Sequence, residues 1–277
     1  MCPVLFTIGD KVTVYGYGLM MALGMIACVA FACWRCKKKY AIDPDIMFNI
    51  AVIGIIAGII GAKLLYWIVE LKNIIADPSF MLRTMTSGFV IYGGLIFGVL
   101  APMVYMVFIK KQTFLDKMDI AVGSIALAQA FGRIGCFLAG CCFGKEIPEG
   151  AWYSFIGMTF PATAFTEAPA GVALIPTQLI SSGLNLVNFV FLTLYASHER
   201  FRGETSCLYM MLYAVGRFLV EFLRGDTVRG FVGTLSTSQF ISIIIFVVGA
   251  ALWVILLKKN GAPLRKVGEY HGEEKKA

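Results

Sequence analysis

Charged residues are scarce in this chain, and histidine is nearly missing. Only 15% of the 277 residues are Asp, Glu, Lys or Arg and two are histidine, whereas 58% are hydrophobic and the mean hydropathy is +0.78. So apolar a composition excludes a water-solvated fold of this length. The first ten residues lack the basic segment that opens a secretory signal, so we expect the first apolar stretch to be retained as an anchor. No repeat or low-complexity tract is visible, which favours a single domain.

Seven apolar stretches come close to the length of about 20 residues that crosses the hydrocarbon of a bilayer. They are residues 14–34, 46–69, 88–109, 120–142, 176–196, 206–223 and 236–257. The sequence therefore predicts an all-α, polytopic membrane protein with seven transmembrane helices. We expect residues 1–259 to form one membrane domain, in which 143–175 is an extracytoplasmic loop or cap. Residues 260–277 are polar and charged, and we expect a disordered cytoplasmic tail.

Basic residues gather after every odd-numbered stretch. The positive-inside rule therefore predicts that the N-terminus lies outside and the C-terminus in the cytoplasm. The net charge of +7 then reflects topology and requires no nucleic-acid partner. The outer loop 143–175 carries several aromatic residues, which favour the membrane surface; it is either a plain connector or a lid over a substrate. The basic clusters are residues 35–39, 110–117, 200–202 and 258–266.

Two arginines lie within the predicted spans, where a charge is costly. Arg133 belongs to the fourth stretch and Arg217 to the sixth. An ionisable residue at such a depth marks a functional site by default. The spacing in the sixth stretch, of four, four and three residues, places a polar set on one helix face. This set is Tyr213, Arg217, Glu221 and Arg224.

The charges on this face allow two interpretations. Glu221 can pair with Arg217 and Arg224, and such an ion network can simply hold helices together. Two arginines against one carboxylate nevertheless leave positive charge, and Arg133 adds to it. A cationic pocket of this kind attracts phosphate, which the planar guanidinium binds bidentately. Because these residues lie in the outer half of the predicted spans, a phospholipid of the outer leaflet is the phosphate that we expect there.

Five segments resemble, in order, the motifs of bacterial prolipoprotein diacylglyceryl transferases. Residues 132–145, Gly-Arg-Ile-Gly-Cys-Phe-Leu-Ala-Gly-Cys-Cys-Phe-Gly-Lys, are similar to the family signature Gly-Arg-x-Gly-Asn-Phe-x-Asn-x-Glu-x-x-Gly. The other four are Tyr-Gly-Leu-Met at 17–20, Ser-Gly-Phe-Val-Ile-Tyr-Gly-Gly-Leu at 87–95, Pro-Thr-Gln-Leu at 176–179 and Arg-Phe-Leu-Val-Glu-Phe-Leu-Arg-Gly-Asp at 217–226. The resemblance runs from residue 17 to the last predicted span.

The resemblance implies a transferase of lipoprotein biosynthesis in the bacterial plasma membrane, with its active site facing the outer side. Such an enzyme moves the diacylglyceryl group of phosphatidylglycerol to the lipobox cysteine thiol in the signal peptide of a preprolipoprotein, and releases glycerol phosphate. Its partners are those two substrates and membrane lipid; we expect a monomer with neither cofactor nor metal. Two alternatives stay open. One is a transferase of the same fold with a different acceptor or a cysteine-dependent mechanism, and the other is a non-catalytic protein that binds or transports anionic lipid.

Charge and matching motifs together define the candidate site. We expect catalytic roles for Arg133, Arg217, Tyr17, Tyr92, Glu221 and Cys141. We expect substrate binding by Gly93, Gly94, Cys136, Gly144, Gln178, Tyr213, Arg224 and Asp226. In these roles the arginines neutralise the phosphate leaving group as charge develops on it. The Gln178 amide is placed to bind headgroup hydroxyls.

The chain departs from the family pattern where a proton acceptor is needed. Tyr92 stands in place of the family histidine, and Cys136 and Cys141 stand in place of the signature Asn and Glu. Both histidines, His198 and His271, fall on the cytoplasmic side of the predicted topology. The acceptor thiol, with an ordinary pKa of about 8.5, must nevertheless lose its proton to react. The identity of the base is therefore open, with Tyr17 and Tyr92 as hydroxyl candidates.

The cysteines at the end of the fourth stretch also have more than one interpretation. Cys136, Cys141 and Cys142 can be small apolar residues packed between helices beside several glycines. Alternatively, Arg133 can lower the pKa of a thiol and make Cys141 catalytic or acyl-carrying. A disulfide between Cys136 and Cys141 is the third possibility, although its geometry is demanding.

Overall fold

The computed structural model describes residues 4–8, 12–85, 87–161, 166–226 and 230–260 and is mostly helical. Three short antiparallel pairs, β1–β2, β3–β4 and β5–β6, accompany the helices. The helices are α1 Gly16–Lys39, α2 Pro44–Val69, α3 Leu71–Ala76, α4 Ser79–Arg83, α5 Ile91–Val104, the π-helix η1 Tyr105–Ile109, α6 Phe114–Ala139, the 3₁₀-helix η2 Ser154–Ile156, α7 Thr177–Tyr195, α8 Glu204–Glu221 and α9 Thr237–Asn260. The strands are β1 Val4–Ile8, β2 Val12–Tyr15, β3 Met158–Thr159, β4 Ala173–Leu174, β5 Phe231–Val232 and β6 Leu235–Ser236.

Six of the described helices are long and apolar enough to cross a membrane. They are α1, α2, α5 with its extension through η1, α6, α7 and α9. The sixth predicted stretch also folds as a helix, α8, but its 18 residues include Glu204, Arg217 and Glu221, and it is not among the six. A multi-pass helical membrane protein is therefore confirmed. The seventh crossing and the orientation of the termini stay predictions, and the predicted tail lies outside the described residues after Asn260.

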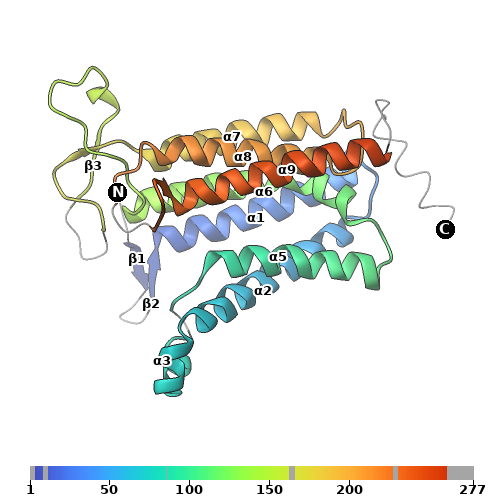
Figure 1. Ribbon diagram of the computed structural model, residues 1–277, viewed down its shortest axis with the longest axis horizontal. Coiled ribbons are helices and arrows are strands. Elements are labelled where there is room, and N and C mark those ends of the chain that lie inside the picture. Colours follow the sequence, from blue (N-terminus) through green and yellow to red (C-terminus); the bar gives the residue numbers. More distant parts are fainter. Residues whose placement is uncertain (1–3, 9–11, 86, 162–165, 227–229, 261–277) are drawn as a thin grey trace. The chain divides into compact units, whose positions relative to one another are not determined.

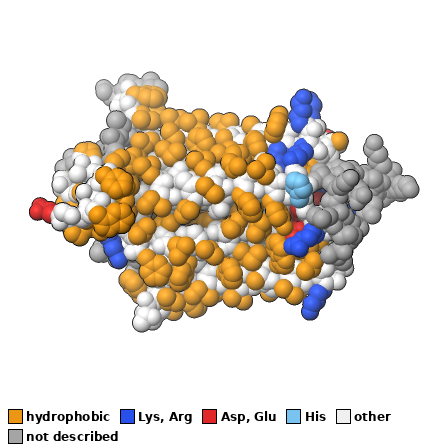
Figure 2. Space-filling model, turned by 90° about the horizontal axis from the view of Figure 1, so that it is seen from above, with side chains coloured by type: hydrophobic (Ala, Val, Ile, Leu, Met, Phe, Trp, Pro, Cys, Tyr) orange, Lys and Arg blue, Asp and Glu red, His pale blue; other side chains and the backbone are white. Residues whose placement is uncertain are grey.

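Contacts divide the chain into two units, which are described separately. Unit 1 is Met1–Ala32 with Met118–Ala277, and unit 2 is Cys33–Lys117. In unit 1, α6, α7, α8 and α9 run side by side, and the β1–β2 pair and the segment that carries β3 lie at one end of them (Figure 1). Figure 2 shows hydrophobic side chains over most of the visible face. The exposed hydrophobic side chains of α9 include Phe246, Val247, Val254 and Ile255, as expected for a surface that faces lipid.

The start of α8 is set by a carboxylate from α6. Gly203, with φ of 91°, turns the chain into α8 and has no side chain with which to cap it. The buried Asp119 takes over this function: its Oδ2 accepts from the Gly203 N–H and its Oδ1 accepts from the Ser206 N–H at 2.8 Å. These bonds satisfy backbone donors that the first helical turn leaves unpaired. They also fix the position of α8 along α6, and hence the position of the polar face of α8.

In unit 2, α2 and α5 pack closely along their glycines. Gly93 lies against Gly61, and a Cβ atom built on Gly93 would overlap the Gly61 carbonyl oxygen and lie 2.6 Å from the Leu65 Cβ. Gly94 is similarly close, with 3.1 Å from an added Cβ to the Gly58 carbonyl oxygen. Small residues permit this approach of helices in a membrane. Close packing thus accounts for glycine at both positions.

Replacing Gly93 with alanine is expected to destabilise unit 2. The added methyl group must push α2 and α5 apart, and overpacking of this kind costs about 1–3 kcal/mol. The midpoint of thermal unfolding of the purified protein in detergent would fall accordingly. Gly18→Ala is the matched control, because a Cβ atom there has no neighbour within 4 Å. Equal midpoints for the two variants would contradict the close packing.

Candidate functional site

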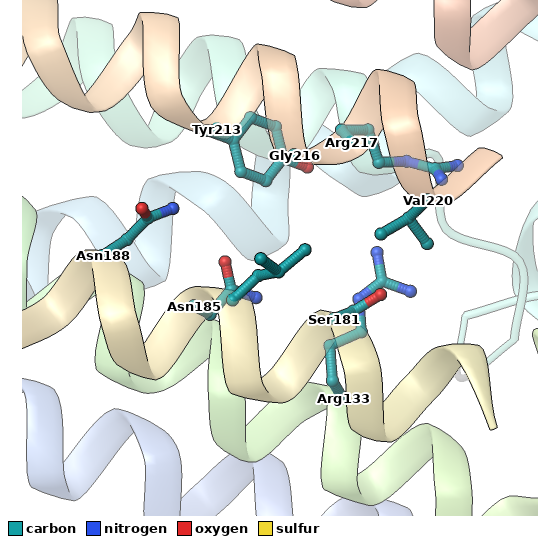
Figure 3. Close-up of a pocket in the computed structure, with 9 residues that line it drawn as sticks. Arg133, Ser181, Asn185, Asn188, Tyr213, Gly216, Arg217 and Val220 are labelled. Carbon is teal, nitrogen blue, oxygen red and sulfur yellow. The ribbon is translucent and has the colours of Figure 1, made fainter. Parts of the chain in front are cut away.

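A polar pocket opens between α6, α7 and α8 in unit 1. Figure 3 shows Arg133 reaching from α6 toward the space between the other two helices, with the Arg133 and Arg217 guanidinium groups on the same side of the pocket, near Ser181 and Val220. Because α7 and α8 contribute residues one helical turn apart, the pocket has a polar wall on each side. The residues that line it are Arg133, Ser181, Leu184, Asn185, Asn188, Tyr213, Gly216, Arg217 and Val220.

The charges on α8 form the network that their spacing predicted. Glu221 Oε2 lies 2.6 Å from Arg217 Nη1 and 3.8 Å from Arg224 Nη1, and the Glu221 side chain is only 2% exposed. Arg217 also donates to Ser238 Oγ of α9 at 2.7 Å, and the Arg224 Nε donates to Asp226 Oδ1 at 2.9 Å. The network therefore joins α8 to α9 and to the segment that follows α8.

Arg133 gives the pocket its excess of positive charge. It lines the pocket with Arg217, and among the described residues no carboxylate pairs with it. Counting it with the network, three arginines face two carboxylates, those of Glu221 and Asp226. A half-buried cation without a counter-ion in an apolar surrounding favours an anionic ligand. The network does hold helices together, but it leaves Arg133 available to such a ligand.

The cysteines of the signature segment lie at the end of α6. The sulfur atoms of Cys136, Cys141 and Cys142 are all within 4.8 Å of one another. Tyr17, at the start of α1, packs against α6 beside these residues: a Cβ atom built on Gly135 would lie 3.2 Å from the Tyr17 Cδ2. The structure thus brings two predicted catalytic residues, Tyr17 and Cys141, to the end of unit 1 where Arg133 lies.

Gln178 and Gly144 hold the segment around these cysteines in place. The Gln178 amide Nε2 donates to the Cys141 carbonyl oxygen at 2.8 Å, so this amide hydrogen is used inside the protein. The N–H of Gly144 donates to the Ile175 carbonyl oxygen at 3.0 Å, and Gly144 pairs with Arg224 as an isolated bridge. A Cβ atom on Gly144 would overlap the Ile175 carbonyl oxygen, which explains the glycine.

Tyr92, Gly93 and Gly94 belong to α5 and therefore to unit 2. The segment before α5 is held by Lys63, a buried cation whose ammonium group donates to the carbonyl oxygens of Ser87 and Gly88 at 2.6 and 3.2 Å. Lys63 also lies over the ring of Phe89, 5.0 Å from its centroid. These contacts stabilise the charge within an apolar unit. Lys63 therefore has a structural role, and Tyr92 follows a segment with a defined conformation.

Sequence reasoning did not include several of the pocket residues. Ser181, Asn185 and Asn188 recur every three or four residues in an apolar stretch, and this spacing was the available signal for a polar face. Gly216 and Ser238 carried no signal, because only the packing of α8 on its neighbours shows what they face.

The fold and the pocket define the class of this protein: a multi-pass helical membrane protein with a cationic site between its helices. The sequence profile of the family described as Prolipoprotein diacylglyceryl transferase matches residues 3–255. The chain belongs to this family. The family that the motifs predicted is thereby confirmed, and with it the class of enzyme, a transferase.

Individual relatives agree with the family match. The chain is 46% identical over 254 residues to the phosphatidylglycerol–prolipoprotein diacylglyceryl transferase of Clostridium tetani, an alignment that covers 90% of the chain and 95% of the relative. It is 44% identical over 243 residues to phosphatidylglycerol–prolipoprotein diacylglyceryl transferase 2 of Clostridium perfringens, covering 87% and 91%. A relative from Dehalococcoides mccartyi with the first of these names is 34% identical over 258 residues, covering 93% and 95%.

Proposed function

We propose that this chain transfers the diacylglyceryl group of phosphatidylglycerol to the lipobox cysteine of a preprolipoprotein signal peptide. The observation that carries the proposal for these residues is the pocket in which Arg133, without a carboxylate partner among the described residues, lies beside Arg217. A pocket with excess positive charge between apolar helices suits the phosphate of a membrane lipid. Family membership supports the same reaction.

The chemistry of the reaction suits this arrangement of charges. The acceptor sulfur forms a bond to the glyceryl carbon, while the bond from that carbon to the phosphate oxygen breaks. Glycerol phosphate leaves with the electron pair, so the phosphate gains negative charge in the transition state. Arg133 and Arg217 would stabilise that charge, the kind of electrostatic contribution that dominates many enzymatic steps. Glu221 would hold Arg217 in position.

We propose both substrate contacts and supporting roles for the other candidate residues. Tyr213 lines the pocket, and Gln178 with Gly144 shapes the segment next to it. Arg224 and Asp226 continue the ion network, while Cys136 lies with Cys141 in the thiol cluster. Gly93 and Gly94 would let α5 present Tyr92, which we propose with Tyr17 as a hydroxyl that accepts the thiol proton.

We also propose a location for the reaction. The protein would lie in the bacterial plasma membrane as a monomer, with all seven predicted stretches across it and the pocket open to the outer side. The basic clusters that follow the odd-numbered stretches support this orientation. An outward-facing pocket can receive both a lipid from the outer leaflet and a signal peptide that has been exported.

A transfer assay tests the proposal directly. Purified full-length protein is incubated with labelled phosphatidylglycerol and a lipobox peptide, and a thioether-linked diacylglyceryl peptide is the expected product. A peptide with serine in place of the cysteine is the control and should give none. Cys141→Ala, measured alongside, shows whether that thiol takes part. Binding of phosphatidylglycerol without any product would contradict the transfer and favour a lipid-binding protein.

Filling the pocket from Gly216 is expected to block the reaction. A Cβ atom on Gly216 has only the Leu184 Cδ1 nearby, at 3.9 Å, so the space beside it is open to the pocket. Gly216→Phe would displace the lipid phosphate from Arg133, and such misplacement can cost about 10²-fold in rate. Gly183→Phe is the matched control, since Gly183 also lies in an open helical position but does not line the pocket. Similar rates for both variants would argue against this pocket as the site.

A further inference from the structure

The three cysteines at the end of α6 lie close together and form no disulfide with one another. Their sulfur atoms lie within 4.8 Å of one another, and all three are half-buried free thiols. Four thiolates around a tetrahedral zinc ion lie about 2.3 Å from the metal, and hence about 3.8 Å apart. The distances between the three sulfur atoms, at most 4.8 Å, are close to this spacing. Small side-chain rotations therefore suffice to place the three sulfurs around one ion.

The backbone that carries two of these cysteines is held from outside the segment. Gly140 and Cys142 both have positive φ, 67° and 58°, and this turns the chain back after α6 so that Cys141 and Cys142 approach Cys136. A positive φ is unfavourable for a residue such as cysteine and persists only where its surroundings impose it. The thiol cluster is therefore imposed by the fold around it.

Two buried side chains at the start of α7 impose this conformation. Thr177 Oγ1 donates to the Cys142 carbonyl oxygen at 2.8 Å, and Gln178 Nε2 donates to the Cys141 carbonyl oxygen at 2.8 Å. Both side chains are 1% exposed. Metal sites depend on such outer contacts to orient their ligands. These two hydrogen bonds thus support the backbone that carries the thiols.

Two arginines lie close to the cluster. The positive charges of Arg224 and Arg133 act on Cys142. Three thiolates with one divalent ion carry a net charge of −1, which these arginines compensate. Three protein ligands also leave the fourth position of a tetrahedral zinc ion open, which is the arrangement of catalytic zinc sites. A structural site would close this position with a fourth protein ligand.

We propose that Cys136, Cys141 and Cys142 bind a zinc ion whose open position takes the acceptor thiol of the signal peptide. This inference rests on the proposed transfer reaction and identifies the group that activates its nucleophile. A metal-bound thiol is deprotonated outright, so the site supplies the function for which this chain has no histidine at the expected position. Arg133 lines the phosphate pocket and acts on the cluster, so the nucleophile and the leaving group would meet at this residue.

The acceptor thiol binds zinc as a thiolate and releases one proton, which the Tyr17 hydroxyl would relay to solvent. The zinc-bound sulfur then forms its bond to the glyceryl carbon, and glycerol phosphate leaves with the electron pair of the broken carbon–oxygen bond. The thioether product is neutral and a weaker ligand than the thiolate. It therefore leaves zinc and reopens the fourth position.

The test measures metal binding and transfer on the same protein. Full-length protein is purified in detergent with a reductant that does not bind metals, stripped of metal and titrated with Co²⁺. We expect one Co²⁺ per chain with a thiolate-to-metal charge-transfer band, and a change in the visible bands when a lipobox peptide is added but not when its cysteine is replaced by serine. Transfer should fall about 10²-fold or more in the stripped protein and return with Zn²⁺, since loss of the group that removes the thiol proton costs at least this much.

Variants separate this site from the other thiols of the chain. Cys136→Ser, Cys141→Ser and Cys142→Ser should each weaken the charge-transfer band, whereas Cys28→Ala, in α1 and outside the cluster, should keep it. The thermal midpoint of each variant shows that it is folded. Full transfer by the stripped protein, an unchanged band in the Cys141→Ser protein, or a Cys136–Cys141 disulfide with no metal bound after reduction would each overturn the zinc site. Metal binding without transfer in any form would instead contradict the proposed reaction.

Discussion

Changing Arg133 to glutamine is expected to lower transfer from phosphatidylglycerol by about 10²–10³-fold, the usual cost of removing one group that stabilises developing charge. Arg133 lines the pocket beside Arg217, and none of the described carboxylates neutralises it. Its positive charge is therefore available to the phosphate, which becomes more negative as the carbon–oxygen bond breaks. The loss should appear mainly in kcat, because the stabilised charge is largest in the transition state.

Two further variants make the interpretation specific. Arg133→Lys keeps the charge but loses the planar fork that binds two phosphate oxygens, so its activity should lie between those of the native protein and Arg133→Gln. Lys258→Ala, at the far end of α9, removes a cation outside the pocket and should leave the rate unchanged. If Arg133→Gln were no slower than Lys258→Ala, the pocket would not be the phosphate site.

Changing Glu221 to glutamine is expected to cause the largest loss of stability. The Glu221 side chain is 2% exposed, and its two arginine partners are 14% and 11% exposed. Removing the carboxylate leaves the positive charges of Arg217 and Arg224 close together with less negative charge to neutralise them. Removing one partner of a buried ion pair costs about 3–5 kcal/mol in stability. The thermal midpoint in detergent should fall accordingly. Glu149→Gln, at an exposed position of the segment 143–175, should leave it unchanged.

A double variant distinguishes a structural role of this ion pair from a catalytic one. Arg217→Gln with Glu221→Gln removes both charges, so it should recover much of the stability that Glu221→Gln loses. It should not recover transfer, because Arg217 would no longer face the phosphate. Recovery of both properties would mean that the pair only holds the helices together. Loss of both would mean that each side chain has contacts beyond the pair.

The helices of this protein could be predicted from sequence because their apolar runs are local and long. For the long helices, the predicted stretches and the observed helices differ in where they begin and end. The fourth predicted stretch, 120–142, is α6 Phe114–Ala139. The helix begins earlier because Asp116, Lys117 and Asp119 belong to it although they are not apolar. It ends earlier because Gly140 adopts a positive φ, which a count of apolar residues does not detect.

The short strands were missed for a similar reason. The β1–β2 pair, of five and four residues, precedes α1, whereas the two-residue pairs β3–β4 and β5–β6 lie between helices. Strands of two residues have no alternating pattern that could be recognised. Their existence depends on pairing with a second segment, and the sequence of one segment does not specify its partner.

The sequence alone determined which polar and charged residues share one face of a single helix. Tyr213, Arg217 and Glu221 share a face of α8 because helical spacing is local, and the observed ion pair follows from it. The motifs likewise identified the family without any knowledge of contacts. Apolar composition determined the membrane environment, since a chain with so few charges cannot be solvated by water.

Only the tertiary structure decided which helices share a site. Arg133 of α6 lies opposite α8 and has no carboxylate partner among the described residues. The Gln178 amide holds the Cys141 backbone, and three thiols lie close together. The physical reason is that contacts between helices depend on close packing at glycines, on buried caps such as Asp119 and on turns with positive φ. Each of these joins residues that are distant in the chain, and periodicity within one helix carries no information about them.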